Sequence, residues 1–214
     1  MIILEIVTIR QIGKENAMYQ YYLFHKPYGC VTARRDDRYP VVMDWFRDLD
    51  VPDLSPVGRL DRETEGLLLI TNDGMWNRQM TRPEFGVEKR YQFTVLGDLT
   101  PEKIAILETG VVLHGQSEPT DPAVIIVTGH STLGEVLPML HPEVQEKSRH
   151  NPPDRPVTFG EIVITQGKNR QIRRMMKAVR CLVLQLKRVS MGDFTLDETL
   201  QPGQWKEIVP KQCG

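Results

Sequence analysis

The pattern of apolar residues along the chain predicts mostly strands. The run Leu67–Thr71 is apolar over the length of one strand and ends at the turn-forming triplet Asn72-Asp73-Gly74. Tyr91–Leu96 alternates between apolar and polar residues, which is typical of a strand with one buried face. Five further strands are predicted at Tyr21–His25, Val111–Leu113, Ala123–Thr128, Thr158–Thr165 and Val183–Arg188.

Helical segments are fewer. Gly74–Thr81 follows Asp73, which is a good N-cap residue, and Thr100–Glu108 carries Pro101 at its first helical position. Val41–Phe46 predicts a single helical turn, and His130–Asp154 is interpreted as a long polar excursion that contains prolines. Many strands with few helices favour an α+β fold built on a large, mostly antiparallel sheet.

One predicted helix carries charge of a single sign. Between Lys168 and Arg188 the chain has eight basic residues and no acidic one, although its net charge is −1. On a helix that begins near Asn169, the basic and apolar residues fall on opposite faces. The basic face holds Arg170, Arg173, Arg174 and Lys177, and the apolar face holds Ile172, Met175, Met176 and Val179. An ordinary solvated helix normally mixes both signs, so we predict a cationic ridge suited to phosphate groups.

The most distinctive stretch is Gly-Arg-Leu-Asp-Arg-Glu-Thr-Glu-Gly at residues 58–66. It places Asp61 between Arg59 and Arg62 on a glycine-bounded turn, directly before the Leu67–Thr71 strand. A polar side chain on such a loop can face a cleft. A capped turn with solvated arginines is the alternative, but the length of the motif favours a site.

This motif, Gly-Arg-Leu-Asp-x-x-Thr-Glu-Gly before an apolar strand and Asn-Asp-Gly, resembles the active-site segment of pseudouridine synthases of the branch that modifies bacterial ribosomal RNA. The segments 25–29, 88–91 and 166–175 resemble other motifs of this family in the same order. Two positions depart from the family pattern, with His25 in place of asparagine and Arg90 in place of threonine. The resemblance covers roughly residues 20–209.

The resemblance implies a pseudouridine synthase fold, with a mixed sheet in two lobes and the catalytic cleft between them. It also implies an isomerisation in which the N1–C1′ bond of uridine breaks, the uracil turns, and C5 bonds to C1′. A base within a stack cannot be reached, so the nucleotide must be extruded into a pocket.

The same resemblance assigns catalytic roles to Asp61, Tyr91 and Arg173. Asp61 acts at the ribose as nucleophile or as base, and the sequence leaves both roles open. Tyr91 stacks on the extruded uracil, unless it is only a core aromatic residue. Arg173 pairs with Asp61 and holds it ionised. RNA contacts are expected from Arg59, Lys89, Lys168, Asn169, Arg170, Arg174 and Lys177.

The remaining chemistry is sparse. The three cysteines have no CxxC spacing, the five histidines have no metal-ligand spacing, and no glycine-rich nucleotide loop occurs. We therefore expect neither a metal ion nor an organic cofactor. No apolar run reaches the length of a membrane span, and unpaired cysteines suit a reducing compartment, so a cytoplasmic protein is expected.

Residues 1–17 are expected to form an N-terminal arm of unknown role, and residues 18–214 the two-lobed catalytic domain. The arm is too short for the S4-type RNA-binding domain of many relatives. That feature and the segment Asn151-Pro152-Pro153-x-Arg155 resemble a member of the branch that acts on the large ribosomal subunit. The expected partner is therefore 23S ribosomal RNA or a pre-ribosomal particle, bound by a monomer.

The sequence leaves several alternatives for the function and its target open. A uridine of the small subunit is the alternative target, and a non-catalytic ribosome-binding protein would explain the cationic ridge equally well. A glycosidase-like hydrolase could use Asp61 with Glu63 or Glu65, but the sequence supplies no aromatic platforms for a sugar. The excursion at His130–Asp154 is either a mobile RNA-contacting loop or a decorated connection.

Overall fold

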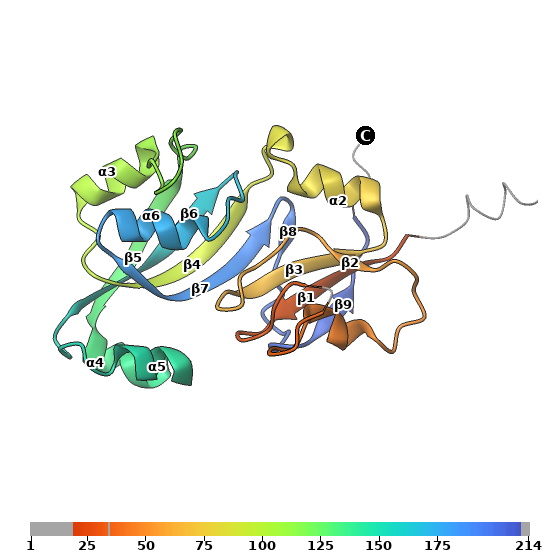
Figure 1. The fold of residues 1–214 in the computed structure, drawn as a ribbon, viewed down its shortest axis with the longest axis horizontal. Coiled ribbons are helices and arrows are strands. Elements are labelled where there is room, and N and C mark those ends of the chain that lie inside the picture. The colour runs from red at the N-terminus through yellow and green to blue at the C-terminus, as the bar shows by residue number, and fades with distance from the viewer. Residues whose placement is uncertain (1–18, 34, 211–214) are drawn as a thin grey trace, which may run out of the picture.

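The computed structural model describes residues 19–33 and 35–210, so the expected N-terminal arm lies outside the described residues. A nine-stranded sheet runs through the molecule in the order β5-β6-β4-β7-β3-β1-β9 (Figure 1). The short strands β2 and β8 pair beside β3 and β7. The strands are β1 (Tyr21–Lys26), β2 (Ser55–Pro56), β3 (Glu65–Thr71), β4 (Lys89–Leu96), β5 (Val124–Thr132), β6 (Pro156–Ile164), β7 (Leu182–Met191), β8 (Phe194–Thr195) and β9 (Trp205–Glu207). This mostly antiparallel sheet with peripheral helices confirms the α+β class.

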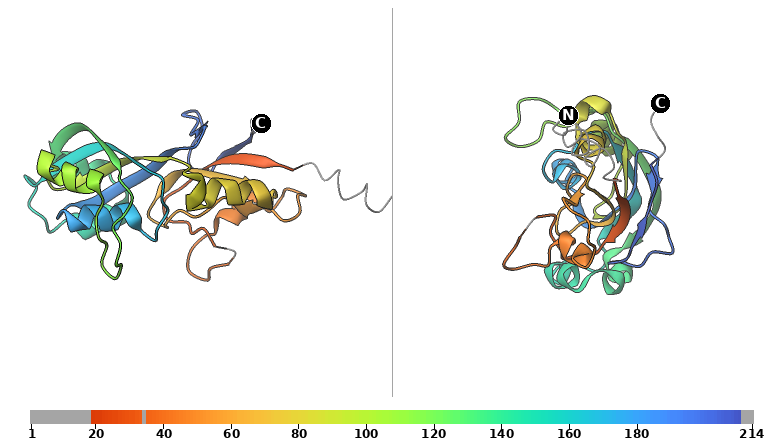
Figure 2. Two further views of the ribbon diagram at one scale, coloured as in Figure 1. Left: turned by 90° about the horizontal axis from the view of Figure 1, so that it is seen from above. Right: turned by 90° about the vertical axis from the view of Figure 1, so that its right-hand side faces the viewer.

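The sheet is shared by two lobes (Figures 1 and 2). The first lobe contains β1, β2, β3 and β9, with the 3₁₀ helix η1 (Val42–Phe46), α2 (Gly74–Thr81) and the short 3₁₀ helix η2 (Pro83–Phe85). The second lobe contains β4 to β7, with α3 (Pro101–Thr109) and α6 (Gln171–Ala178). Both α3 and α6 contribute to the main core cluster, which they bury against β4, β6 and β7.

The lobes meet at a short parallel junction between β3 and β7. Only Glu65 with Lys187 and Gly66 with Arg188 are paired there. A Cβ atom added to Gly66 would lie 2.3 Å from the carbonyl oxygen of Arg188, so the junction requires glycine. The buried Arg188 side chain reinforces it, since Nε donates to the carbonyl oxygen of Leu67 at 2.8 Å.

Local sequence signals account for the helices well. The Asp73 carboxylate accepts from the backbone amides of Met75 and Trp76, which confirms it as the N-cap of α2. Helix α3 begins at Pro101, as predicted. The four apolar residues predicted to face the core from the basic helix, Ile172, Met175, Met176 and Val179, are all buried. The helix itself begins at Gln171, because Arg170 has a left-handed backbone with φ 48°.

One predicted strand is corrected, and one open question is resolved. Val111–Leu113 is not a strand, because only an isolated bridge joins Val112 to Pro119, and Val111 and Leu113 pack into the core as a loop. For the polar excursion, where a mobile loop and a decorated connection were both open, the structure shows an ordered helical segment between β5 and β6, called the insertion below, that follows the end of β5 at Thr132. It consists of α4 (Leu133–Val136), the 3₁₀ helix η3 (Leu137–Met139) and α5 (Pro142–Ser148).

The insertion packs by its apolar residues. Leu133, Val136 and Leu140 are buried in a separate core cluster with residues of β4, β6 and β7. Their burial makes the insertion a decorated connection with its own core rather than a loose loop. Across the described part of the chain, no helix is long and apolar enough to span a membrane.

Candidate active site

The turn at residues 58–66, called the Asp61 turn below, leads from β2 into β3 at the junction of the lobes. Each backbone carbonyl from Leu60 to Thr64 accepts a hydrogen bond. The Leu60 carbonyl accepts from Thr32 Oγ1 at 2.9 Å, that of Asp61 from the Thr64 amide at 3.0 Å, and that of Arg62 from the Gly29 amide at 2.8 Å. The Glu63 carbonyl accepts from Arg173 Nη2 and that of Thr64 from Lys26 Nζ, each at 2.8 Å. The backbone that carries Asp61 is therefore fixed from β1, from the loop after β1 and from α6.

Lys26 is a residue whose role the sequence did not reveal. Its side chain is fully buried at the end of β1, and Nζ donates to the carbonyl oxygens of Pro27 at 3.0 Å and Thr64 at 2.8 Å. Burial lowers the pKa of Lys26 to about 8. The sequence signal was its place in the segment 25–29, which resembles a family motif, but that resemblance assigned no role to the lysine.

Two hollows adjoin Asp61. The deep hollow has a volume of about 80 Å³, and Tyr91 of β4, Leu186 of β7 and Arg173 of α6 contribute to its walls. The outer hollow is wider, at about 400 Å³, and lies toward Thr32 and Asn169. The residues that line both are Arg59, Leu60, Asp61, Gly167, Lys168 and Arg170. Asp61 therefore lines both a small hollow, which includes the buried residues Tyr91 and Leu186, and a larger one.

The structure brings most of the predicted site residues to these hollows. Tyr91 is 7% exposed and lines the deep hollow, whereas Arg59 is exposed at the rim that both hollows share. Asn169 is exposed and lines only the outer hollow. Arg174 and Lys177 lie further along α6 and line neither hollow, although they share the outward face of the helix with Arg170.

Lys89 requires a correction. It is 7% exposed, and its Nζ donates to the carbonyl oxygens of Val87 at 2.7 Å and Thr165 at 2.8 Å. Burial lowers the pKa of Lys89 to about 8. An ammonium group enclosed by two backbone carbonyls joins the start of β4 to the end of β6. Lysine side chains are mostly exposed, so the sequence alone predicts an exposed one, but the register of these strands buries Lys89.

The direct ion pair predicted between Arg173 and Asp61 is wrong as a contact in this structure. Within the described residues, no ion pair joins these two side chains. Arg173 instead donates from Nη2 to the Glu63 carbonyl oxygen at 2.8 Å and from Nη1 to the Val183 carbonyl oxygen at 3.3 Å. Its Nε is buried without a hydrogen-bond partner, 4.0 Å from the Glu63 carboxylate. Burial lowers the pKa of Arg173, and the negative charge of Glu63 opposes this shift.

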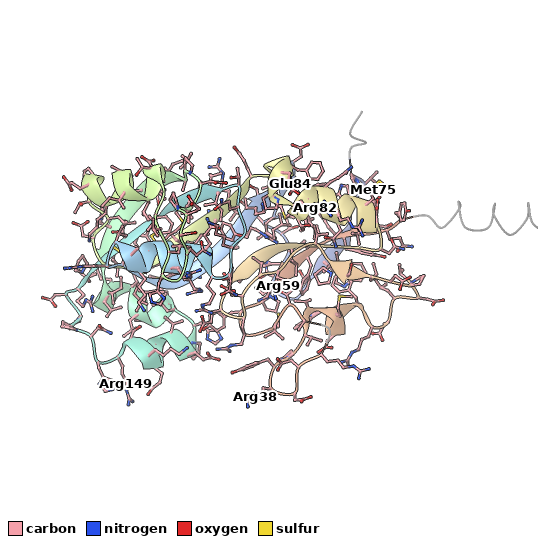
Figure 3. All side chains as sticks on the ribbon, turned by 45° about the horizontal axis from the view of Figure 1, so that its top comes forward. Arg38, Arg59, Met75, Arg82, Glu84 and Arg149 are labelled. Atoms are coloured by element: carbon pink, nitrogen blue, oxygen red, sulfur yellow. The ribbon has the colours of Figure 1, made fainter. Side chains whose placement is uncertain are left out.

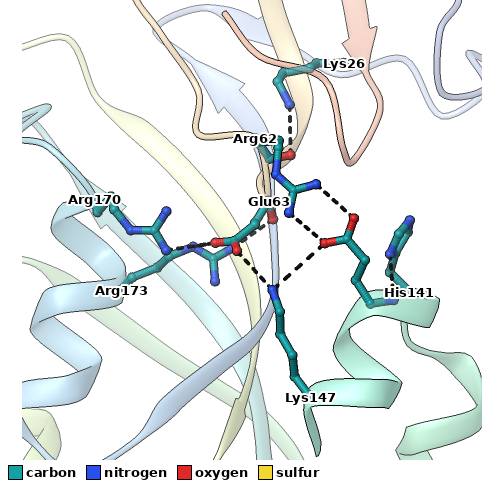
Figure 4. Close-up of polar contacts among 8 residues, drawn as sticks. Lys26, Arg62, Glu63, His141, Lys147, Arg170 and Arg173 are labelled. Carbon is teal, nitrogen blue, oxygen red and sulfur yellow. Dashed lines mark hydrogen bonds and ion pairs between the residues drawn. The ribbon is translucent and has the colours of Figure 1, made fainter. Parts of the chain in front are cut away.

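The two motif positions between Asp61 and Thr64 connect the turn to the inserted helix α5 (Figure 4). Arg62 contacts both carboxylate oxygens of Glu143, with Nη1 at 2.9 Å and Nη2 at 2.6 Å. Hydrogen bonding from Arg62 lowers the pKa of Glu143 to about 2. This pairing ties the Asp61 turn to the second lobe beyond the β3–β7 junction.

The Glu63 carboxylate is a meeting point of cations from both α6 and α5 (Figure 4). Arg170 Nη2 lies 2.8 Å from Glu63 Oε2, and Lys147 Nζ lies 3.5 Å from Oε1. Burial opposes ionisation of Glu63, but the hydrogen bond from Arg170 and the charges around it lower its pKa overall. These contacts could not be predicted, because Lys147 and Glu143 lie some eighty residues further along the chain.

No group of three or more histidine, cysteine, aspartate or glutamate side chains in the described residues could hold a metal ion. Acid–base chemistry by Asp61, with arginine and lysine side chains around it, is what this arrangement of groups can perform. An aromatic residue and a carboxylate that line one hollow suit a planar base and its ribose.

Comparison with known proteins agrees with this geometry. Residues 20–178 match the model of a family described as RNA pseudouridylate synthase. The chain is 36% identical to ribosomal large subunit pseudouridine synthase E of Vibrio parahaemolyticus, over 87% of this chain and 72% of that protein. It is 30% identical to ribosomal small subunit pseudouridine synthase A of Haemophilus influenzae, over 90% of this chain and 72% of that protein.

A solved structure supports the same conclusion. The crystal structure of a pseudouridylate synthase superposes with a TM-score of 0.71 at 30% identity, covering 89% of this chain and 70% of that one. The sheet order, the Asp61 turn at the junction of the lobes and the family match point to one assignment. The chain belongs to the RNA pseudouridylate synthase family and is an RNA pseudouridine synthase, which is an isomerase.

Proposed function

We propose that this enzyme converts a specific uridine of large-subunit ribosomal RNA to pseudouridine, with Asp61 as the reacting carboxylate. The observation that carries the proposal is that Asp61 lines both hollows, on a turn whose carbonyls from Leu60 to Thr64 all accept hydrogen bonds. A fixed carboxylate beside an aromatic recess places a reacting group next to an extruded nucleotide without further ordering of the backbone.

The reaction exchanges one glycosidic bond for another. The N1–C1′ bond breaks, the uracil turns within the recess, C5 bonds to C1′, and the C5 proton leaves while N1 gains one. No atom is gained or lost overall, so the isomerisation needs no co-reactant. Asp61 acts at the ribose, as nucleophile or as base. The deep hollow receives the uracil against Tyr91, and the outer hollow leaves room for the ribose and its phosphate.

The surrounding cations take the remaining roles. Arg59, exposed at the shared rim, occupies the stack that the extruded base leaves. Lys168, Asn169 and Arg170 line the opening and contact the backbone of the extruded nucleotide. Arg170 holds a left-handed backbone conformation at the start of α6, a strained geometry that is characteristic of functional sites. Arg174 and Lys177 extend the basic surface along the helix for neighbouring phosphates.

The large subunit is the preferred target for two reasons. Identity is higher to the large-subunit synthase E, at 36%, than to the small-subunit synthase A, at 30%. The segment Asn151-Pro152-Pro153-x-Arg155 also resembles the large-subunit type, and here Arg155 donates to the Asn151 side chain within the turn that returns from α5 to β6. A small-subunit uridine is the second candidate, since relatives named for small-subunit modification match over most of the chain.

Purified enzyme is expected to release tritium from C5-labelled uridine in 23S ribosomal RNA, to a limit of one equivalent per transcript. Labelled 16S ribosomal RNA serves as the matched substrate and should release none. Chelator should leave the rate unchanged. Tritium release from 16S RNA alone would show that the target uridine lies in the small subunit, and it would overturn the target assignment.

Arg173→Lys is expected to lower kcat by about tenfold to a hundredfold while leaving the KM for RNA nearly unchanged, since a small misplacement of a reacting group has an effect of this size. Lysine keeps the charge, but it lacks the planar fork whose two separate nitrogens donate to the carbonyl oxygens of Glu63 and Val183. Arg90→Lys is the control, because Arg90 pairs with Glu161 away from the hollows. Steady-state kinetics decide the matter, and a rise in KM without a fall in kcat would make Arg173 an RNA contact rather than a positioning residue.

A further inference from the structure

A third hollow, the α5–α6 groove, opens beside the site. It lies between the inserted helix α5 and the basic face of α6, and its volume is about 390 Å³. Five basic side chains line it, from Lys147 on one side and Arg170, Arg173, Arg174 and Lys177 on the other. Glu63 is the acidic residue among its lining. Arg170 and Arg173 also line the deep hollow, so the groove and the hollow that holds Asp61 share these two arginine side chains as walls.

Helix α5 is a firmly attached wall of this groove. Glu143 makes the two-oxygen contact with Arg62, and the rings of His141 and Tyr28 stack with centroids 3.8 Å apart. The apolar residues before α5 are buried in their own core cluster. A cationic side chain carried by α5 is therefore held at a fixed distance from α6, as a binding site requires.

We propose that the α5–α6 groove binds the RNA backbone next to the extruded uridine, with Lys147 as a phosphate ligand supplied by the insertion. The proposal rests on the proposed function and adds a site to it. Lys147 is well placed for this role, because its side chain is 62% exposed and its Nζ points toward the Glu63 carboxylate at 3.5 Å (Figure 4). That exposed, long contact is weak, so a phosphate can replace or join the carboxylate at little cost.

The composition of the groove favours a nucleic acid strand over a protein segment. Its charged lining is of one sign apart from Glu63, which already pairs with Arg170. The larger part of the exposed lining is apolar, and riboses and bases can lie against it; it comes from Tyr28, Val144, Leu182, Val183 and Leu184. Phosphates flanked by sugars satisfy both features, and the groove shares two arginine side chains with the hollow that holds the reacting carboxylate.

The experiment combines the Lys147→Ala variant with RNA in which one backbone phosphate at a time is replaced by an uncharged group. Short RNA substrates that contain the target uridine carry a single methylphosphonate at successive flanking positions. With unmodified RNA, Lys147→Ala should weaken binding about fivefold and lower the slope of log affinity against log salt by about 0.7, the value for one contact to a single strand. At one of these positions, the methylphosphonate should weaken RNA binding by the wild type by a similar factor. The same methylphosphonate should not change RNA binding by Lys147→Ala.

Arg149→Ala is the control, since Arg149 lies at the outer end of α5, pairs with Glu146 and is not part of the groove (Figure 3). It should bind as the wild type does. If Lys147→Ala keeps the wild-type affinity and slope while the enzyme still isomerises the RNA, the groove proposal fails and the proposed function stands. Additive effects at every methylphosphonate position would also overturn it, as would a defect of Lys147→Ala that appears only with ribosomal particles and not with free RNA.

Discussion

Asp61→Asn is expected to lower turnover by about a thousandfold or more, while the unfolding midpoint and RNA affinity stay close to the wild type. Asparagine has the shape of aspartate, but it can neither attack the ribose nor accept a proton. The turn should survive the change, because its hydrogen bonds come from backbone carbonyls and not from the Asp61 side chain. Single-turnover tritium release measures the loss, and direct RNA binding is measured in parallel.

Asp193→Asn is the matched control for this change. Asp193 is exposed in the turn between β7 and β8, and the same substitution there should leave turnover unchanged. If Asp61→Asn kept the wild-type turnover, the Asp61 carboxylate would take no part in the reaction. Loss of RNA affinity or of cooperative unfolding together with turnover would give Asp61 a structural role.

Gly66→Ala is expected to destabilise the protein by about 3 kcal/mol or more, the largest stability effect that we predict. The added Cβ atom would lie 2.3 Å from the Arg188 carbonyl oxygen and 2.8 Å from its amide nitrogen, and Gly66 has φ +103°. Overpacking and backbone strain each cost about 1–3 kcal/mol in such cases, and here they act at the same residue. The measurement is the free energy of unfolding in urea.

Gly115→Ala separates these two contributions. Gly115 also has a positive φ, of +77°, but an added Cβ atom would meet nothing within 4 Å, so strain alone should cost about 1–2 kcal/mol. The difference between the variants reports the close contact of β3 with β7. Equal losses would mean that the junction yields to a methyl group and does not fix how the lobes meet.

Local signals in the sequence were sufficient for the elements that they define directly. Asp73 caps α2 as predicted because an N-cap depends only on its own side chain and the next few amides. The basic helix could be assigned because its apolar and cationic residues separate at the helical period, and the buried positions match those on the predicted apolar face. The predicted residues Asp61, Tyr91 and Arg173 come together in one hollow, although three separate segments supply them.

Features that depend on packing between distant segments could not be predicted in this way. Lys89 has the composition of a surface contact, but the pairing of β4 with β6 encloses it between two carbonyls. Arg173 lies beside the Asp61 turn as expected, yet its partner is the backbone of Glu63, a choice set by distances that no motif encodes. The insertion shows the same limit, because nothing near Lys147 in sequence indicates that α5 folds back against the site.

We propose that Asp61 drives isomerisation of one uridine in large-subunit ribosomal RNA. The most direct measurement maps pseudouridine at single-nucleotide resolution in ribosomal RNA from cells that lack this protein. The cells are complemented either with the wild type or with Asp61→Asn. We expect one pseudouridine in 23S ribosomal RNA to disappear when the gene for this protein is deleted, to return with the wild type, and to stay absent with Asp61→Asn. Return of that pseudouridine with Asp61→Asn, or an unchanged map on deletion, would contradict it.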